Sequence, residues 1–189
     1  MNKLFHGALF FLTILAISNA FAEGERVTMF EDKILGIKFE YPDSWNPLTA
    51  SQEVNYNLIK FSHPAYAKEF PYSLLEQRYT SSQIKIENFF RANVTLDQYL
   101  KSAFSKAIFI PNFTIVELNK NATLGGIPAY RLIYNYVDKT YVDDVKVTSF
   151  NIFAIKGFTA YIFSINVPTA LASQYVPRMQ KIVDSFTVS

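Results

Sequence analysis

The 189-residue chain has no cysteine, and histidine occurs only at His6 and His63. Without cysteine there can be no disulfide bond, thiolate metal ligand, cysteine nucleophile or lipid anchor on cysteine. Two histidines are also too few for a histidine-rich zinc or copper site within one chain. These absences exclude several classes of enzyme and metalloprotein, but they do not define a cellular compartment.

An excess of charge of one sign is missing as well. The chain carries 18 lysine and arginine residues against 16 aspartate and glutamate residues, a formal net charge of +2. One unit belongs to Lys3, in a segment that we expect to be removed, so the mature domain is close to neutral. No basic run is interleaved with aromatic residues. We therefore expect no nucleic-acid partner.

Short catalytic and nucleotide-binding motifs are missing too. There is no G-x-S-x-G motif, no P-loop and no D-x-D-x-D-G calcium loop. The pair Gly125-Gly126 is too short to cradle a phosphate. We expect no enzyme activity and no cofactor. Because any two acidic side chains can meet in a fold, a carboxylate-based hydrolase stays open as an alternative.

Aromatic residues, in contrast, are abundant. The chain has 18 phenylalanines, 12 tyrosines and one tryptophan, Trp45. Aromatic side chains fit a pleated, half-buried surface, so this composition favours a β-rich structure. An aromatic-lined ligand surface is the alternative interpretation. The length suffices for one domain with a substantial core.

The N-terminus is typical of a secretory signal peptide. Lys3 is followed by the apolar run 8–17 and then by Ala20-Phe21-Ala22, a small-x-small cleavage pattern. The run is shorter than the roughly 20 residues that a spanning helix needs. We expect cleavage between Ala22 and Glu23, which leaves a single domain, 23–189, without a transmembrane anchor. An uncleaved anchor is the alternative.

The first half of the mature chain predicts a hairpin and a tight turn. Alternating apolar residues indicate strands over Val27–Phe30 and Ile37–Tyr41. Pro42 and Pro47 then bracket a polar turn around Trp45, whose indole we interpret as a plug at the end of the core. Further strands are predicted over 54–61 and 82–90.

The second half predicts four antiparallel strands and two helices. The strands cover 113–122, 129–136, 145–155 and 158–167, with short connections between neighbours. A helix over 95–109 begins with a capping box of Thr95 and Gln98. Apolar residues from Leu171 to Phe186 indicate a second helix, with a break expected near Val176 because Pro177 follows. The sheet is apolar on both faces, so helices must cover both. The expected class is α+β, an antiparallel sheet sandwiched between helices.

Four stretches of this chain match segments of a known family in order and spacing. They are 36–47 (GIKFEYPDSWNP), 96–100 (LDQYL), 124–130 (LGGIPAY) and 182–188 (IVDSFTV). Together they resemble the PsbP family, which comprises the extrinsic photosystem II protein PsbP and its PsbP-like relatives. The resemblance spans nearly all of residues 27–189 and implies the PsbP-like α/β/α sandwich.

The resemblance also implies a non-catalytic accessory role. PsbP helps to retain Ca2+ and Cl− at photosystem II, so an extrinsic protein of that type, with Ca2+ retention, is one alternative. This chain departs from the pattern: it has a plain secretory signal, little sequence between Ala22 and the first strand, and a long segment over 63–81. We expect a secreted, monomeric domain, in the periplasm or on the cell surface, that docks on an exported or membrane-associated protein complex. A carrier that holds a small apolar ligand between sheet and helix is a further alternative.

Candidate partner-binding residues lie in the Trp45 turn and in the segment 63–81, because loops of this length within a compact domain are often functional. The candidates are Trp45, Tyr66, Phe70, Tyr72 and Tyr79.

Candidate metal ligands are few. His63 with Glu69 could form a weak metal contact, and Asp143-Asp144 could offer carboxylates to Ca2+, although turn propensity explains the aspartates as well.

Three N-x-T sequons occur, at Asn93, Asn112 and Asn121. In a secreted protein they could carry glycans. Chance occurrence is the alternative in a chain rich in asparagine and threonine.

Overall fold

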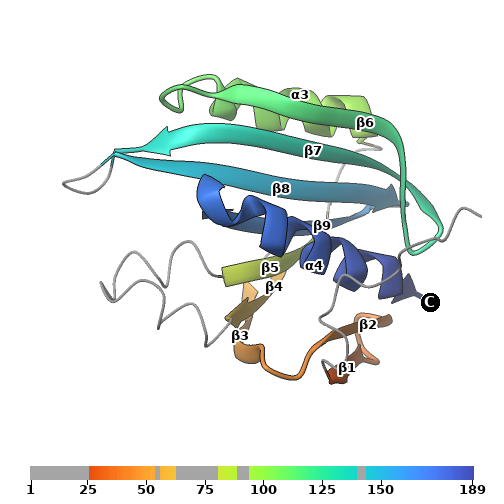
Figure 1. Ribbon diagram of the computed structural model, residues 1–189. Coiled ribbons are helices and arrows are strands. Elements are labelled where there is room, and N and C mark those ends of the chain that lie inside the picture. The colour runs from red at the N-terminus through yellow and green to blue at the C-terminus, as the bar shows by residue number, and fades with distance from the viewer. Residues whose placement is uncertain (1–25, 54–55, 63–80, 89–93, 140–143) are drawn as a thin grey trace, which may run out of the picture.

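The computed structural model describes residues 26–53, 56–62, 81–88, 94–139 and 144–189 (Figure 1). Within these ranges the chain forms two antiparallel sheets and two helices. The expected signal peptide and its cleavage site at Ala22 and Glu23 lie outside the described residues.

The larger sheet has seven strands in the order β3-β4-β5-β9-β8-β7-β6, all antiparallel to their neighbours. Its strands are β3 (Asn46–Glu53), β4 (Tyr56–Ser62), β5 (Ser81–Asn88), β6 (Thr114–Leu124), β7 (Ile127–Asp138), β8 (Val145–Lys156) and β9 (Thr159–Pro168). The four consecutive strands expected in the second half are confirmed. Their short connections produce the β6–β9 meander, because adjacent hairpins pair with one another.

The smaller sheet is built from β1 (Val27–Asp32), β2 (Ile37–Pro42) and β10 (Thr187–Val188), in the order β1-β2-β10. The expected hairpin is confirmed, with Phe30 directly opposite Phe39. The two rings stack with centroids 4.8 Å apart. Because its strands pair with each other and with β10, this hairpin belongs to a separate sheet and does not extend the larger one.

The main core lies between the seven-stranded sheet on one side and the helix α4 (Ala172–Ser185) with the small sheet on the other. Phe163 of β9 contacts Phe39 of β2 and Phe186 edge to face, at centroid distances of 6.0 and 4.9 Å. From α4, Met179 and Ile182 are almost fully buried. Aromatic and branched side chains of three elements thus interlock in one core.

The opposite face of the large sheet is covered by the helix α3 (Leu96–Ala107). Leu100 packs on Leu132 of β7 and Phe153 of β8, and all three are buried. The Thr95–Gln98 capping box is confirmed, with both reciprocal hydrogen bonds present at 2.9 and 3.2 Å. Helices on both faces of an antiparallel sheet make the fold α+β, as expected from the apolar pattern.

The strand β3 was not expected. The sequence predicts a turn through Pro47 and a strand from residue 54, whereas β3 begins at Asn46 and β4 at Tyr56. A proline is tolerated here because β3 is an edge strand and its register shifts between Pro47 and Thr49.

The end of the chain also differs from the expectation. α4 is continuous through Pro177, so the break predicted near Val176 is wrong; a 3-10 turn, η1 (Thr169–Leu171), does precede the helix. Pro177 and Ser173 are both exposed, so water can bond the Ser173 carbonyl that the proline nitrogen leaves without a donor. Phe186 leaves the helix in an extended conformation and is buried all the same.

Candidate functional site

The Trp45 turn does not present its indole to a partner. Trp45 is 1% exposed and belongs to the main core. Its backbone N–H donates to the Pro42 carbonyl at 2.8 Å, which closes the turn, and Asp43 accepts a hydrogen bond from the Thr28 hydroxyl. The interpretation as a core plug is confirmed. The prediction that Trp45 contacts a partner is wrong, because burial removes its side chain from the surface.

The other aromatic candidates, Tyr66, Phe70, Tyr72 and Tyr79, lie outside the described residues. So do His63, Glu69 and Asp143 from the candidate metal ligands. Asp144 is exposed directly before β8. Within the described part of the chain, no three histidine, cysteine or acidic residues are grouped as a metal site would require.

Two of the three sequon asparagines can be placed. Asn112 is exposed in the turn between α3 and β6 and has a φ of +54°, a left-handed conformation in which asparagine is enriched. Asn121 is exposed at a register shift of β6, where its N–H donates to Oδ1 of Asn119. Turn and bulge geometry account for both asparagines. Asn93 lies outside the described ranges.

An exposed apolar surface lies where α3 ends and β6 begins. It consists of Ile108, Phe109, Ile115 and Val116, which we call the α3-end surface; Phe109 is 82% and Ile108 66% exposed. The helix ends at Ala107, and the Ile110 N–H donates back to the Ala107 carbonyl as the chain turns. Among the described strands, β6 is an edge strand and pairs with β7 alone. Exposed large apolar side chains on two neighbouring segments make this part of the surface a candidate interaction site.

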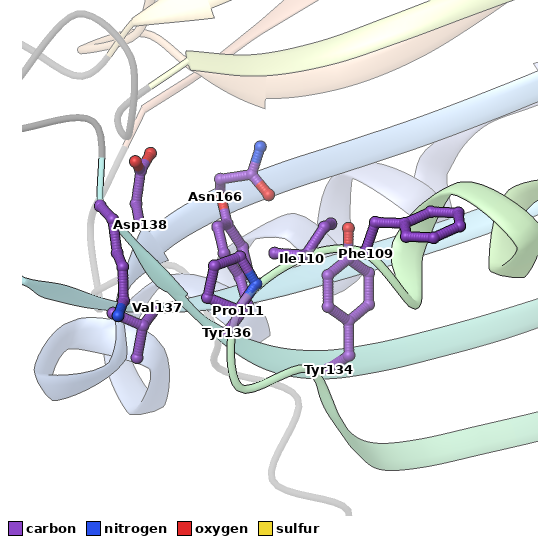
Figure 2. Close-up of a pocket in the computed structure, with 9 residues that line it drawn as sticks. Phe109, Ile110, Pro111, Tyr134, Tyr136, Val137, Asp138 and Asn166 are labelled. Atoms are coloured by element: carbon purple, nitrogen blue, oxygen red, sulfur yellow. The ribbon is translucent and has the colours of Figure 1, made fainter.

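A pocket of about 480 Å³ adjoins this surface, and we call it the tyrosine pocket (Figure 2). β7 contributes Tyr134, Tyr136, Val137 and Asp138, and Lys139 follows directly after it; β9 contributes Asn166, and the turn after α3 contributes the residues 109–111. Tyr134 and Tyr136 are two residues apart on one strand, so they share the sheet face that α3 covers. Ser149 of β8 lies opposite Tyr134 of β7 and opposite Asn166 of β9. The Asn166 side chain therefore lies on the same sheet face as Tyr134, one strand beyond Ser149.

Packing and hydrogen bonds hold the walls of the pocket in place. Phe113 lies between Phe104 of α3 and Tyr134, with ring centroids 6.2 and 5.0 Å away, and Tyr136 follows at 5.9 Å from Tyr134. The Val137 N–H donates to the Pro111 carbonyl at 2.9 Å, which joins the turn to β7. The pocket is therefore formed by the fold itself and needs no ligand to assemble it.

The charges beside the pocket nearly cancel, because Asp138 and Lys139 follow one another at the end of β7. The polar groups of the site are phenolic hydroxyls, one amide, one carboxylate and one ammonium. This mixture is suited to orienting a bound molecule through hydrogen bonds while the aromatic rings supply contact area.

The clearest shifts in pKa occur at the other end of α3. Hydrogen bonds from Lys120 and Tyr130 hold the pKa of Asp97 below its ordinary value, and the Asp97–Lys120 ion pair is 2.7 Å long. Burial raises the pKa of Tyr99, and the neighbouring Glu87 carboxylate raises it further. These interactions attach α3 to the sheet and explain both shifts without a catalytic role.

The sequence alone does not indicate the tyrosine pocket. Its residues come from three segments, and only the β7–β8–β9 register brings Asn166 beside the tyrosines. The available signal was the pair Tyr134 and Tyr136, two residues apart on a predicted strand and therefore on the same face of it.

Comparisons with known proteins show the fold. No protein-family model and no curated protein matches the chain. The solution structure of cyanobacterial PsbP from Synechocystis sp. PCC 6803 is 14% identical, with a TM-score of 0.59, and the match covers 89% of this chain and 95% of that one. LpqN of Mycobacterium tuberculosis, described as involved in cell envelope biogenesis, is 16% identical, with a TM-score of 0.51 and coverages of 88% and 92%. The expected PsbP-like fold is thereby confirmed over most of the chain.

Within the described residues, no helix combines the length and the apolar character needed to cross a bilayer.

Proposed function

We propose that this protein is a non-catalytic accessory domain that works outside the cytoplasm and binds a partner protein through the α3-end surface and the tyrosine pocket. The observation that carries the proposal is the exposure of Phe109 and Ile108 beside a preformed pocket. Large exposed apolar side chains beside a pocket are typical of interaction sites, and aromatic residues are enriched among those that dominate binding energy at interfaces.

The extracytoplasmic location is supported by two observations. The N-terminus has the parts of a cleavable secretory signal. The structural relative LpqN is described as a protein of cell envelope biogenesis. An exported partner, or a membrane-associated complex that faces the same compartment, fits both.

A carrier of a small apolar ligand is the second candidate, and the size of the tyrosine pocket favours it. A volume of about 480 Å³ lies within the range of small-molecule sites. The pocket lies at the end of α3, however, and not between α4 and the sheet, where Phe39, Phe163 and Met179 are fully buried. A docking site agrees better with this arrangement.

Affinity capture tests the proposal with a matched pair of variants. The full chain with a C-terminal tag is expressed in its source cell, and proteins retained from the solubilised envelope are quantified for the wild type, Phe109→Ala and Phe158→Ala. Phe158 is also an exposed phenylalanine, 57% accessible, but it lies in the β8–β9 turn at the other end of the sheet.

We expect a stoichiometric partner that Phe109→Ala loses and Phe158→Ala retains. The docking proposal is contradicted if no protein is retained, or if both variants retain the same proteins as the wild type. A small molecule found by native mass spectrometry in the wild type alone, without a protein partner, would instead favour the carrier.

A further inference from the structure

We propose that the tyrosine pocket binds an extended, proline-containing peptide segment. This inference deepens the proposed function, since the segment would belong to the docking partner. It rests on the combination of adjacent aromatic rings, hydrogen-bond donors and a rigid wall in one open pocket.

The aromatic part of the pocket matches the shape of proline side chains. Tyr134 and Tyr136 project from one strand with ring centroids 5.9 Å apart and planes inclined by 38°, and Phe109 also lines the pocket (Figure 2). A pair of neighbouring tyrosine rings can contact the flat, rigid pyrrolidine rings of a polyproline II helix. Grooves lined by aromatic residues are the recurring solution for such segments.

The polar part of the pocket matches the backbone of such a segment. A polyproline II helix has no internal hydrogen bonds, so its carbonyl oxygens are free to accept from the protein. Figure 2 shows the Asn166 amide and the Tyr134 hydroxyl toward the same side of the pocket. Both groups can donate to carbonyls while the rings contact the prolines.

The entropic cost of binding is low on both sides. The pocket is held by the stacked rings of Phe104, Phe113 and Tyr134 and by the hydrogen bond from Val137 to Pro111. A proline-rich segment is already extended before it binds. Binding therefore restricts few rotatable bonds in the protein or in the peptide, which favours affinity from a modest contact area.

Other occupants fit these observations less well. A partner strand added to the edge strand β6 would meet register shifts after Ile115 and after Asn119, and such bulges disturb edge pairing. An anion would meet Asp138 together with Lys139, so the pocket gives it no net attraction. A proline-containing segment uses the tyrosines, the amide and the open shape together.

Fluorescence anisotropy with fluorescein-labelled decaproline tests the inference on the full-length protein, with a glycine–serine peptide of the same length as the control probe. We expect saturable binding of decaproline and at least tenfold weaker binding of the control peptide. Phe109→Ala should weaken decaproline binding about tenfold and Asn166→Ala severalfold, because the first removes an aromatic wall and the second a donor. Phe158→Ala should leave binding unchanged.

The inference is overturned if decaproline does not bind the wild type, if the glycine–serine peptide binds equally well, or if Phe109→Ala and Asn166→Ala bind like the wild type. These results are separable from the capture experiment. A captured partner that depends on Phe109, without decaproline binding, leaves docking intact and removes proline recognition. Decaproline binding without any captured partner leaves proline recognition intact and contradicts docking on a partner protein.

Discussion

At the scale of single residues, Gly125 shows how closely the β6–β7 turn approaches the main core. Its φ is +58°, and a Cβ at this position would lie 3.1 Å from the ring of Phe186. Gly157, in the β8–β9 turn, has nearly the same φ of +60°, but no atom of the described residues beyond its chain neighbours lies within 4 Å of its Cβ position. The two glycines therefore share a backbone requirement and differ only in packing.

Gly125→Ala and Gly157→Ala should for this reason lose different amounts of stability. The left-handed backbone costs both alanines about 1 kcal/mol. Gly125→Ala must also displace a buried ring, which adds about 1–3 kcal/mol. Urea unfolding of the two variants measures the difference, and equal losses would contradict the packing argument.

The ion pair of Asp97 and Lys120 gives a second prediction at this scale. Lys120→Ala should raise the pKa of Asp97 toward its ordinary value, while the hydrogen bond from Tyr130 keeps part of the shift. Because the folded pKa is lowered, the pair stabilises the fold above the ordinary pKa of the carboxyl, and this contribution disappears as the pH falls through the folded pKa. A carboxyl-carbon NMR titration reports the change directly.

Lys106→Ala is the control for that titration. Lys106 is exposed in the last turn of α3, whereas Asp97 is in the first turn. It should leave the Asp97 titration unchanged. An unaltered pKa of Asp97 in Lys120→Ala would show that the pair does not cause the shift.

At the scale of elements, α4 carries a proline in its interior. Pro177→Ala should stabilise the protein by about 2 kcal/mol, because alanine restores the hydrogen bond to the Ser173 carbonyl and is a better helix former than proline. Part of this gain is offset, since proline restricts the unfolded chain and its removal raises the conformational entropy of the unfolded state. Thermal and urea unfolding check the change. Gln174→Ala, at another exposed position of α4, should change the stability by less than about 0.5 kcal/mol. A destabilised Pro177→Ala variant would show that the proline fits its place better than alanine does.

Elements with strong local patterns could be predicted from the sequence, and those set by tertiary pairing could not. Apolar residues at helical spacing from Leu96 to Phe104, after a capping box at Thr95, predict α3, and the alternation along β6 to β9 predicts four strands. β10 has only two residues and exists because Val188 pairs with Ile37. β3 was missed because Pro47 normally argues against a strand, and its edge position makes the proline tolerable.

The same distinction explains the candidate sites. Trp45 combines a turn and an aromatic ring, which suits either a surface or a core, and only the packing shows that it is core. The tyrosine pocket depends on register across three strands, which local patterns do not encode. The exposure of Phe109 follows from where α3 ends, and the sequence places it at the end of the predicted helix.

At the scale of the whole molecule, β6 is a long edge strand with exposed Ile115 and Val116. Its register shifts and the exposed Lys120 work against edge-to-edge association. We therefore expect the purified domain to be a monomer in analytical ultracentrifugation at micromolar concentration. A stable dimer would show that this edge is not protected.

The proposed role depends on one end of the molecule. The core is closed by aromatic contacts, and the α3-end surface with the tyrosine pocket offers apolar side chains and donors to a partner. The PsbP-like fold supplies the scaffold, and this chain's own residues supply the surface.

The most direct test is photo-crosslinking in the source cell, with p-benzoylphenylalanine replacing Phe109 in one strain and Phe158 in another. The proposal predicts a discrete crosslinked protein, visible after illumination, for position 109 and not for position 158. Absence of any adduct at position 109, or identical adducts at both positions, would contradict docking through the α3-end surface.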